Sequence, residues 1–168
     1  MQVDGGVDHR IRIRVQQEDF DLSTEVIALR SRDPGVGAVS TFVGTVRDSG
    51  DGQPLRSLEL EHYPGMTERS MTAMAEAALE RFDIRALSII HRVGALGPQE
   101  QIVLVAVSAA HRGEAFLACE FLMDFLKTQA PFWKKEIQAD GSAAWVDARV
   151  CDEAATRRWS MSPEGPQG

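Results

Sequence analysis

Cysteine, lysine and net positive charge are all scarce in this chain of 168 residues. Its two cysteines, Cys119 and Cys151, lack the paired spacing of a zinc site or a thioredoxin motif, and they are too few for a disulfide framework. We therefore expect no structural metal. The net charge of −7 and pI near 5.1 weigh against a nucleic acid or an anionic membrane as partner, because both require a basic surface. Any anion site must be local.

Long apolar runs are absent as well. No stretch approaches the roughly 18 apolar residues that a membrane span needs, and residues 1–8 show no apolar segment behind a basic start. These features predict a cytoplasmic protein. The 43% hydrophobic and 26% charged content is that of an ordinary globular protein. The length favours a single domain over residues 1–159, with a disordered tail over 160–168.

What the chain does contain is a series of strand patterns, with alternating or β-branched residues. They cover residues 10–15, 36–46, 55–63, 86–93 and 101–108. The unbroken apolar run from Ile102 to Val107 indicates a strand that is covered on both faces. Glycine and proline predict a mobile loop at 48–54 and a turn at 94–98.

Helical patterns follow the strands. Apolar residues recur at helical spacing from Met71 to Phe82 and over 114–127. A shorter helix over 22–29 begins with a plausible serine cap. A short strand or hairpin over 132–146 and a polar helical segment over 152–159 complete the chain. The order of elements favours an α+β fold in which helices pack on a mostly antiparallel sheet.

The only three lysines, Lys127, Lys134 and Lys135, fall together, whereas fifteen arginines are scattered along the chain. Because arginine supplies charge elsewhere, the lysines mark a segment where a compact, deprotonatable amine is needed. A lysine with a depressed pKa would act as a base or nucleophile, and a charged one would hold a phosphate or a carboxyl terminus. The alternative is a solvated basic patch at a helix end.

Two aromatic residues, Phe132 and Trp133, lie inside the lysine segment. They could wall a pocket and lower the pKa of a nearby lysine by desolvation, or they could fill the core under the helix end. For Trp133 we favour core filling.

Two further places suit an anion. His111, Arg112 and Gly113 lie where a buried strand ends and a helix begins, so that free amides, the helix dipole and two side-chain donors converge. The alternative is a capping arrangement in which Arg112 pairs with nearby acids. Arg47 follows a long strand beside the glycine-bearing loop, where it could clamp an oxyanion or simply lie on the surface.

Five stretches of the chain together resemble a known family. They are Gly37-Ala-Val-Ser-Thr-Phe-Val-Gly-Thr-Val-Arg47, Leu58-Glu-Leu-Glu-His-Tyr-Pro-Gly-Met-Thr-Glu68, Ile90-His-Arg-Val-Gly94, Ser108-Ala-Ala-His-Arg112 and Lys127-Thr-Gln-Ala-Pro-Phe-Trp-Lys-Lys-Glu136. In this order, across about residues 36–149, they are similar to the signature blocks of the catalytic (large) subunit of molybdopterin synthase.

The resemblance implies an α/β hammerhead fold and a heterotetramer. In that family a dimer of large subunits receives, on each copy, the Gly-Gly tail of a small ubiquitin-like sulfur-carrier subunit. The tail arrives as a thiocarboxylate, and its sulfur passes to cyclic pyranopterin monophosphate (precursor Z) to form the dithiolene of molybdopterin. The resemblance implies no metal or organic cofactor for the protein itself.

The resemblance also assigns roles to individual positions. Lys127 and Lys134 match the catalytic lysines of the family. The remaining matched positions are expected to contact substrate: Thr45, Val46, Arg47, His111, Arg112, Lys135, Glu136 and Arg149. The chemistry of these residues agrees with the roles that the resemblance implies. Arginine and imidazole suit a cyclic phosphate, and lysine suits the carrier tail.

Helix length leads to a hypothesis about assembly. About 15 residues of helix separate Arg112 from Lys127, so their backbones should lie roughly 20 Å apart. A single pterin cannot easily touch both. We therefore expect a composite site, in which Lys127, Lys134 and Arg47 of one subunit meet His111, Arg112 and Arg149 of a second copy.

Two other function classes compete with this one. A cysteine-persulfide sulfurtransferase would need an exposed, activated cysteine, whereas Cys119 falls on the apolar stripe of a predicted helix and is expected to be a buried hydrophobe. A non-catalytic adaptor for a ubiquitin-like tail would keep the lysines but would need no pterin site. The joint presence of Arg47, His111 and Arg112 disfavours it.

Overall fold

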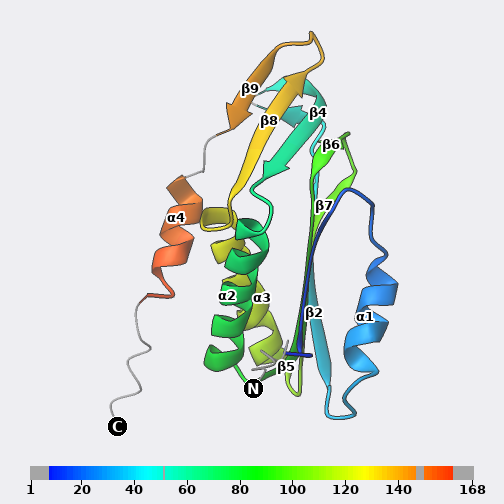
Figure 1. Ribbon diagram of the computed structural model, residues 1–168, viewed down its shortest axis with the longest axis vertical. Helices are drawn as coiled ribbons and strands as arrows, with labels where there is room; N and C mark the ends of the chain where they lie inside the picture. The colour runs from blue at the N-terminus through cyan, green and yellow to red at the C-terminus, as the bar shows by residue number, and fades with distance from the viewer. Residues whose placement is uncertain (1–7, 51, 147–149, 161–168) are drawn as a thin grey trace, which may run out of the picture.

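Two β-sheets and four helices make up the computed structural model, which describes residues 8–50, 52–146 and 150–160 (Figure 1). The first sheet has the order β1-β5-β7-β2, with bounds Ile11–Gln16, Ile84–Arg92, Gln101–Ala109 and Ala38–Thr45. The second has the order β3-β4-β8-β9, with bounds Ser49–Gly50, Gln53–His62, Phe132–Gln138 and Ala143–Val146, and β6 (Gly94–Leu96) also pairs with β4. The helices are α1 (Leu22–Arg30), α2 (Met66–Arg81), α3 (Arg112–Thr128) and α4 (Val150–Arg157).

The first sheet is covered on both faces, as the apolar run in β7 predicts. Val103, Val105 and Val107 pack in the core beneath α2 and α3. Leu104 and Ala106 point to the other face and pack with residues of α1. Figure 1 shows α1 on one side of this sheet and α2 with α3 on the other. The mixed α+β class is confirmed, and every strand pair is antiparallel except β1 with β5.

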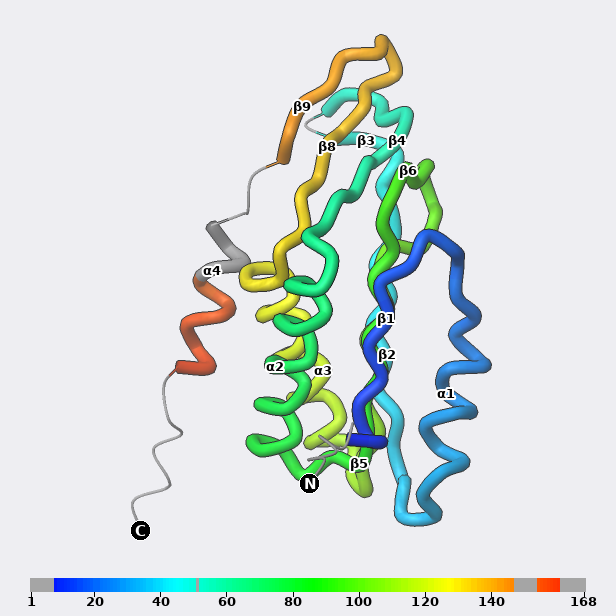
Figure 2. Tube along the Cα trace, in the orientation of Figure 1, coloured from blue at the N-terminus to red at the C-terminus, as the bar shows by residue number. Residues whose placement is uncertain are grey.

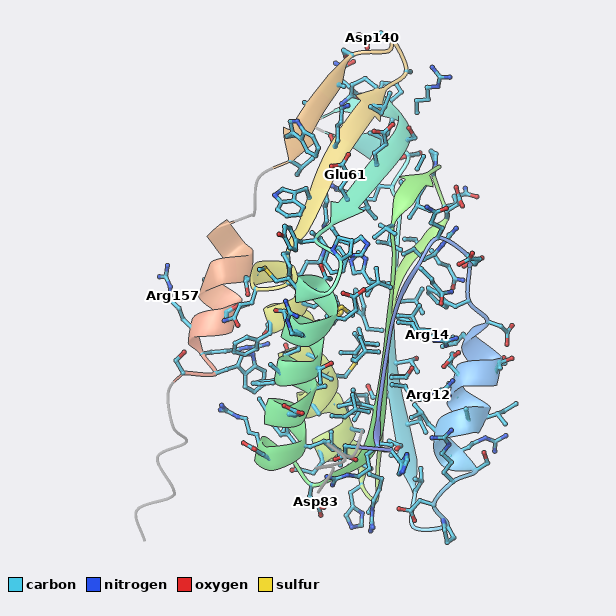
Figure 3. All side chains as sticks on the ribbon, in the orientation of Figure 1. Arg12, Arg14, Glu61, Asp83, Asp140 and Arg157 are labelled. Atoms are coloured by element: carbon cyan, nitrogen blue, oxygen red, sulfur yellow. The ribbon has the colours of Figure 1, made fainter. Side chains whose placement is uncertain are left out.

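The α1 face also buries a carboxylate. Glu25 is only 5% exposed, and it pairs with Arg14 and, at 3.8 Å, with Arg12, both from β1. Figure 3 shows the two arginines between the sheet and α1. The predicted serine cap of α1 is wrong. Asp21 caps the helix instead, because its carboxylate accepts a hydrogen bond from the Thr24 backbone at 2.7 Å.

Two short strands were missed. The predicted loop at 48–54 contains β3, and the predicted turn at 94–98 contains β6. Both pair with β4. The partners of β6 lie far away in the sequence, at 58–60, whereas β3 pairs with Gln53 and Pro54, only a few residues further on. Through β6 the chain passes from the first sheet to the second. Val46, Leu58, Leu60 and Leu96 form a small core at this junction.

Helix α3 leads directly into the second sheet. Figure 2 follows the chain from the end of α3 through a short connection into β8. Helix α2 holds that connection, because Ser70 donates from its hydroxyl to the Gln129 carbonyl at 3.3 Å and the fully buried Thr67 lies 3.5 Å from the Pro131 carbonyl. The end of α3 and the start of β8 are therefore fixed relative to each other.

The last described segment is anchored by Trp159. Its ring makes edge-on contacts with Phe82 at 6.0 Å and Phe121 at 5.5 Å between centroids, and its Nε1 donates to the Asp124 carboxylate at 2.6 Å. Arg81 donates to the Trp159 carbonyl at 2.7 Å. The predicted helical segment is thus confirmed as α4 followed by an aromatic anchor. Of the predicted disordered tail, 161–168 lies outside the described residues.

We predict that Trp159→Ala lowers the free energy of unfolding by about 2 kcal/mol, less than for a fully buried tryptophan because the ring is only half-buried. For a chain of this size the melting temperature should fall by about 4–8 °C. Thermal unfolding followed by circular dichroism measures this. Trp145→Ala is the matched control, because Trp145 is 57% exposed and its loss should shift the melting temperature far less. Equal shifts for the two variants would contradict an anchoring role.

None of the helices in the described part of the chain is long and apolar enough to cross a membrane. The cytoplasmic location stays a prediction.

Candidate active site

The three lysines do not form one patch. Lys127 lies in the last turn of α3, while Lys134 and Lys135 are neighbours in β8. Since side chains alternate across a strand, Lys134 shares a face with its partner Leu60, and Lys135 points to the opposite face. There Lys135 Nζ lies 3.9 Å from a Glu59 carboxylate oxygen and 5.7 Å from the centroid of the Trp145 ring. Lys135 therefore has partners on the outer face.

Lys127 and Lys134 both act electrostatically on a buried histidine, His91, at the end of β5. Burial is the main reason that the pKa of His91 falls to about 3, and the charges of Lys134 and Lys127 lower it as well. His91 is 6% exposed. Its ring is thus neutral near pH 7, and both lysine ammonium groups lie close enough to act on it. The two residues that the family resemblance marks as catalytic therefore act on the charge state of the same buried ring.

Phe132, and not Trp133, fills the core below these lysines. The Phe132 ring packs against the main core and stacks on His91 with 3.7 Å between centroids and an interplanar angle of 16°. Trp133 is 48% exposed, so the prediction that it fills the core is wrong. The reason is the register of β8 on β4, which pairs Phe132 with His62 and turns Trp133 outward with Glu61.

Glu136 lies on the same face of β8 as Lys134, opposite Leu58. Its carboxylate packs against the backbone of Gly50, and a Cβ atom at position 50 would collide with it. Gly50 belongs to β3, shortly after Arg47. Glu136 is therefore on the side of the second sheet that carries Lys134.

Thr45, Val46 and Arg47 come at the end of β2, where the chain leaves the first sheet. The Val46 amide donates to the Glu100 carbonyl at 2.9 Å, and the Val46 carbonyl accepts from Gln99 at 2.8 Å. Val46 is buried in the small core with Leu58 and Leu60, whereas Thr45 and Arg47 are exposed. These backbone hydrogen bonds fix the backbone next to Arg47, while the Arg47 side chain is exposed to solvent.

His111 and Arg112 lie at the other end of α3. His111 is the N-cap residue, its backbone is extended, and its side chain makes no capping hydrogen bond. Both side chains are exposed, and no ion pair of Arg112 is found within the described parts of the chain. The alternative of Arg112 pairing with nearby acids is therefore not supported. The free amides at this helix start, together with two cationic or donor groups, suit an anion.

The predicted separation between the two ends of α3 is confirmed. The helix is continuous over 17 residues from Arg112 to Thr128. At about 1.5 Å rise per residue, the backbones of Arg112 and Lys127 are roughly 20 Å apart. One subunit therefore does not bring His111 and Arg112 to the lysine pair. Arg149 lies outside the described residues.

Two histidines at the site were not identified from the sequence. In the sequence, His91 is one polar residue within an apolar strand, and His62 is the last residue of an alternating strand. Neither pattern marks a functional residue. His62 pairs with Phe132 across the strands, and its Nδ1 is buried without a hydrogen-bond partner in the described structure. The position of His62 next to β8 depends on the pairing of β4 with β8, and that of His91 depends on its contact with Phe132 across the two sheets. Local sequence patterns contain neither.

Cys119 is a buried residue of α3, as expected. It is 6% exposed, its Sγ lies 3.9 Å from the Val105 carbonyl, and burial raises the pKa of its thiol. Such a thiol carries little thiolate near pH 7 and is poorly suited to nucleophilic attack. Among the described residues, no group of three or more His, Cys, Asp or Glu side chains is arranged to hold a metal ion.

The sequence and the fold both match known proteins. Residues 15–129 match the family model described as MoaE protein. The molybdopterin synthase catalytic subunit of Ralstonia nicotianae is 58% identical over 149 residues, which cover 89% of this chain and 84% of the relative. A solved MoaE protein of molybdopterin biosynthesis from Burkholderia ambifaria is 53% identical, with a TM-score of 0.77 over 90% of this chain and 99% of that one.

A more distant structure shares the fold. It is described as a complex of subunits 1 and 2 of the molybdopterin-converting factor from Helicobacter pylori. Its matched chain is 19% identical with a TM-score of 0.67, over 82% of this chain and 91% of that one.

Proposed function

Because the chain belongs to the MoaE family of molybdopterin synthase catalytic subunits, we propose that it transfers sulfur to a pterin in molybdenum cofactor biosynthesis. The sulfur donor is the C-terminal thiocarboxylate of a small ubiquitin-like carrier subunit. The acceptor is cyclic pyranopterin monophosphate, precursor Z, and the product carries the dithiolene of molybdopterin.

The observation that supports this most strongly is that Lys127 and Lys134, from different elements, both act on the buried ring of His91. Two ammonium groups from different elements lie near one neutral, buried ring, and the third lysine is turned to the other face. Such a pair of cations suits an anionic tail that arrives between them. The lysines would neutralise the thiocarboxylate, polarise its carbonyl, or transiently accept the acyl group.

The substrate phosphate requires a separate set of donors. We assign this role to Arg47, His111 and Arg112, whose side chains are all exposed. Thr45, Val46, Lys135, Glu136 and Arg149 complete the assignment on the strength of the resemblance alone. The side chain of Lys135 points away from Lys134 within one subunit, so its contact with substrate would be made on the outer face of β8.

We further propose that the complete site is shared between two copies of this chain. Since α3 separates Arg112 from Lys127 by roughly 20 Å, the anion holders of one copy would serve the lysine pair of the other. This arrangement requires a homodimer of catalytic subunits. With one small subunit bound to each copy, the assembly would be a heterotetramer. The distant structural neighbour, which is described as a complex of two subunits, supports the small-subunit partner.

Reconstitution tests the proposal. Purified chain, thiocarboxylated carrier and precursor Z should together yield molybdopterin, and omission of any one should abolish it. A carrier that ends in an ordinary carboxylate is the matched control for the sulfur source. Failure to form product with all three components present would reject the proposed function.

A non-catalytic adaptor is the second candidate, and binding distinguishes it. A catalytic subunit should bind both the carrier tail and precursor Z, whereas an adaptor should bind the tail only. The exposed Arg47, His111 and Arg112, which have no evident structural task, favour the catalytic subunit.

A further inference from the structure

Three aromatic rings form a layer at the start of β8, which we term the ring layer: His62, Phe132 and His91. Phe132 stacks on His91 with 3.7 Å between centroids, and the centroid of the His62 ring lies 6.3 Å from that of Phe132 at a tilt of 31°. The rings come from β4, β8 and β5. The layer therefore joins the second sheet to the first at the start of β8, two residues before Lys134.

The hydrogen bonding of His91 determines which of its ring nitrogens carries the proton. Nδ1 lies 2.8 Å from the Arg92 carbonyl oxygen, which can only accept, so Nδ1 must donate. In a neutral ring the other nitrogen, Nε2, then carries only a lone pair. Burial keeps the ring neutral by holding the pKa of His91 near 3. Near pH 7 His91 is therefore a fixed hydrogen-bond acceptor.

Lys134 is well placed to use that acceptor. It lies two residues after Phe132 on the same face of β8, and Phe132 is in contact with the His91 ring. The titratable groups that lower the pKa of His91 come from three elements: Lys134 of β8, Lys127 of α3 and His62 of β4. Of these, Lys134 has the largest effect.

We propose that His91 is a positioning residue, which accepts a hydrogen bond at Nε2 from the Lys134 ammonium and holds that group beside Lys127. Phe132 fixes the plane of the imidazole by stacking, and the Arg92 carbonyl fixes its tautomer. A neutral acceptor holds the lysine without cancelling its charge, whereas a carboxylate in the same place would neutralise it. The importance of this for sulfur transfer rests on the proposed function, but the hydrogen bond itself does not.

Amine labelling of the full chain tests the hydrogen bond independently of activity. Acetic anhydride is applied in short pulses over a range of pH, and the three lysines are quantified separately by peptide mass spectrometry. His91→Phe keeps a stacked ring but removes the hydrogen-bond acceptor. The ammonium form of Lys134 is then less stable relative to the neutral amine. The midpoint of Lys134 labelling should then fall by about one pH unit relative to Lys135, which is about a tenfold gain in labelling rate on the rising part of the curve.

His91→Gln is the conservative variant, since its amide oxygen can still accept. It should restore the Lys134 midpoint to within about 0.3 pH units of the unaltered chain, a small part of the one-unit effect of losing the acceptor. An unchanged Lys134 midpoint in His91→Phe would overturn the proposal. An equal shift of Lys134 and Lys135 would overturn it too, because it would indicate a general change of structure.

Nitrogen NMR provides a second measurement that requires no substitution of His91. In the unaltered chain the His91 ring should show a protonated Nδ1 and an unprotonated Nε2. Lys134→Ala should move the Nε2 resonance, and Arg56→Ala, which removes an exposed cation from β4, should not. A protonated Nε2 would refute the proposed hydrogen bond. So would an Nε2 chemical shift that is unchanged in Lys134→Ala.

An activity measurement then connects the hydrogen bond to sulfur transfer. We expect His91→Phe to lower kcat about tenfold with the KM for the carrier little changed, and His91→Gln to recover most of the rate. If labelling and NMR behave as expected but the unaltered chain forms no molybdopterin, the proposed function fails and the positioning of Lys134 stands. If the unaltered chain is active but the Lys134 labelling midpoint is unchanged in His91→Phe, only the positioning role of His91 fails.

Discussion

Lys134→Ala is expected to slow molybdopterin formation by at least about 100-fold, the usual cost of removing a charge-stabilising group from an active site. Its charge acts on the buried His91 more strongly than that of Lys127, and no other residue of β8 on the same face is a lysine or arginine. The measurement is single-turnover product formation with saturating carrier and precursor Z. Melting temperature should change little, because the side chain is only half-buried.

Arg56→Ala is the matched control for Lys134→Ala. Arg56 is an exposed cation of β4 in the same sheet, outside the candidate site, and its loss changes the net charge by the same amount. We expect the rate to stay within about twofold of the unaltered chain, since isolated exposed charges contribute little. A comparable loss in both variants would indicate a general electrostatic effect and would contradict a specific role for Lys134.

Arg112→Ala should raise the KM for precursor Z by at least about tenfold, because a hydrogen bond to a charged group is worth about 1.5–3 kcal/mol. Arg112 is exposed at the N-terminal end of α3, so the fold does not depend on its side chain. The expected loss is therefore in substrate binding. Steady-state kinetics with precursor Z as the varied substrate measures it.

Arg112→Lys tests whether charge alone is sufficient. A lysine keeps the positive charge but lacks the forked donors of guanidinium, so we expect a KM between those of Arg112→Ala and the unaltered chain. The KM for the carrier should be unaffected in both variants. An unchanged KM for precursor Z in Arg112→Ala would remove Arg112 from the anion site.

Much of the fold follows from local patterns. The apolar run from Ile102 to Val107 predicted a strand covered on both faces, and helical spacing predicted α2 and α3, because burial imposes these periods directly. The cap of α1 was missed by two residues, because aspartate and serine both serve as caps and both are present. The strands β3 and β6 were missed because each is only two or three residues long and exists through its pairing with β4.

The candidate site was predictable in its residues but not in its geometry. The lysine cluster was visible in the sequence, yet the separation of Lys134 from Lys135 depends on which face of β8 is buried. That face is set by the register with β4, which also turns Trp133 outward, against the expectation that it fills the core. His91 could not be linked to the lysines from sequence, since 36 residues separate it from Lys127.

Mixing two inactive subunits tests the central claim, that the lysine pair of one copy works with the anion holders of another. With precursor Z kept well below its KM, Lys127→Ala and Arg112→Ala subunits are each expected to retain at most about a tenth of the activity, and they are combined under conditions that allow exchange. In a random equimolar mixture half of the dimers are mixed, and each mixed dimer has one intact site of two, so we predict recovery to about a quarter of the unaltered activity. No recovery above either variant alone, with exchange verified by mass spectrometry, would contradict the shared site.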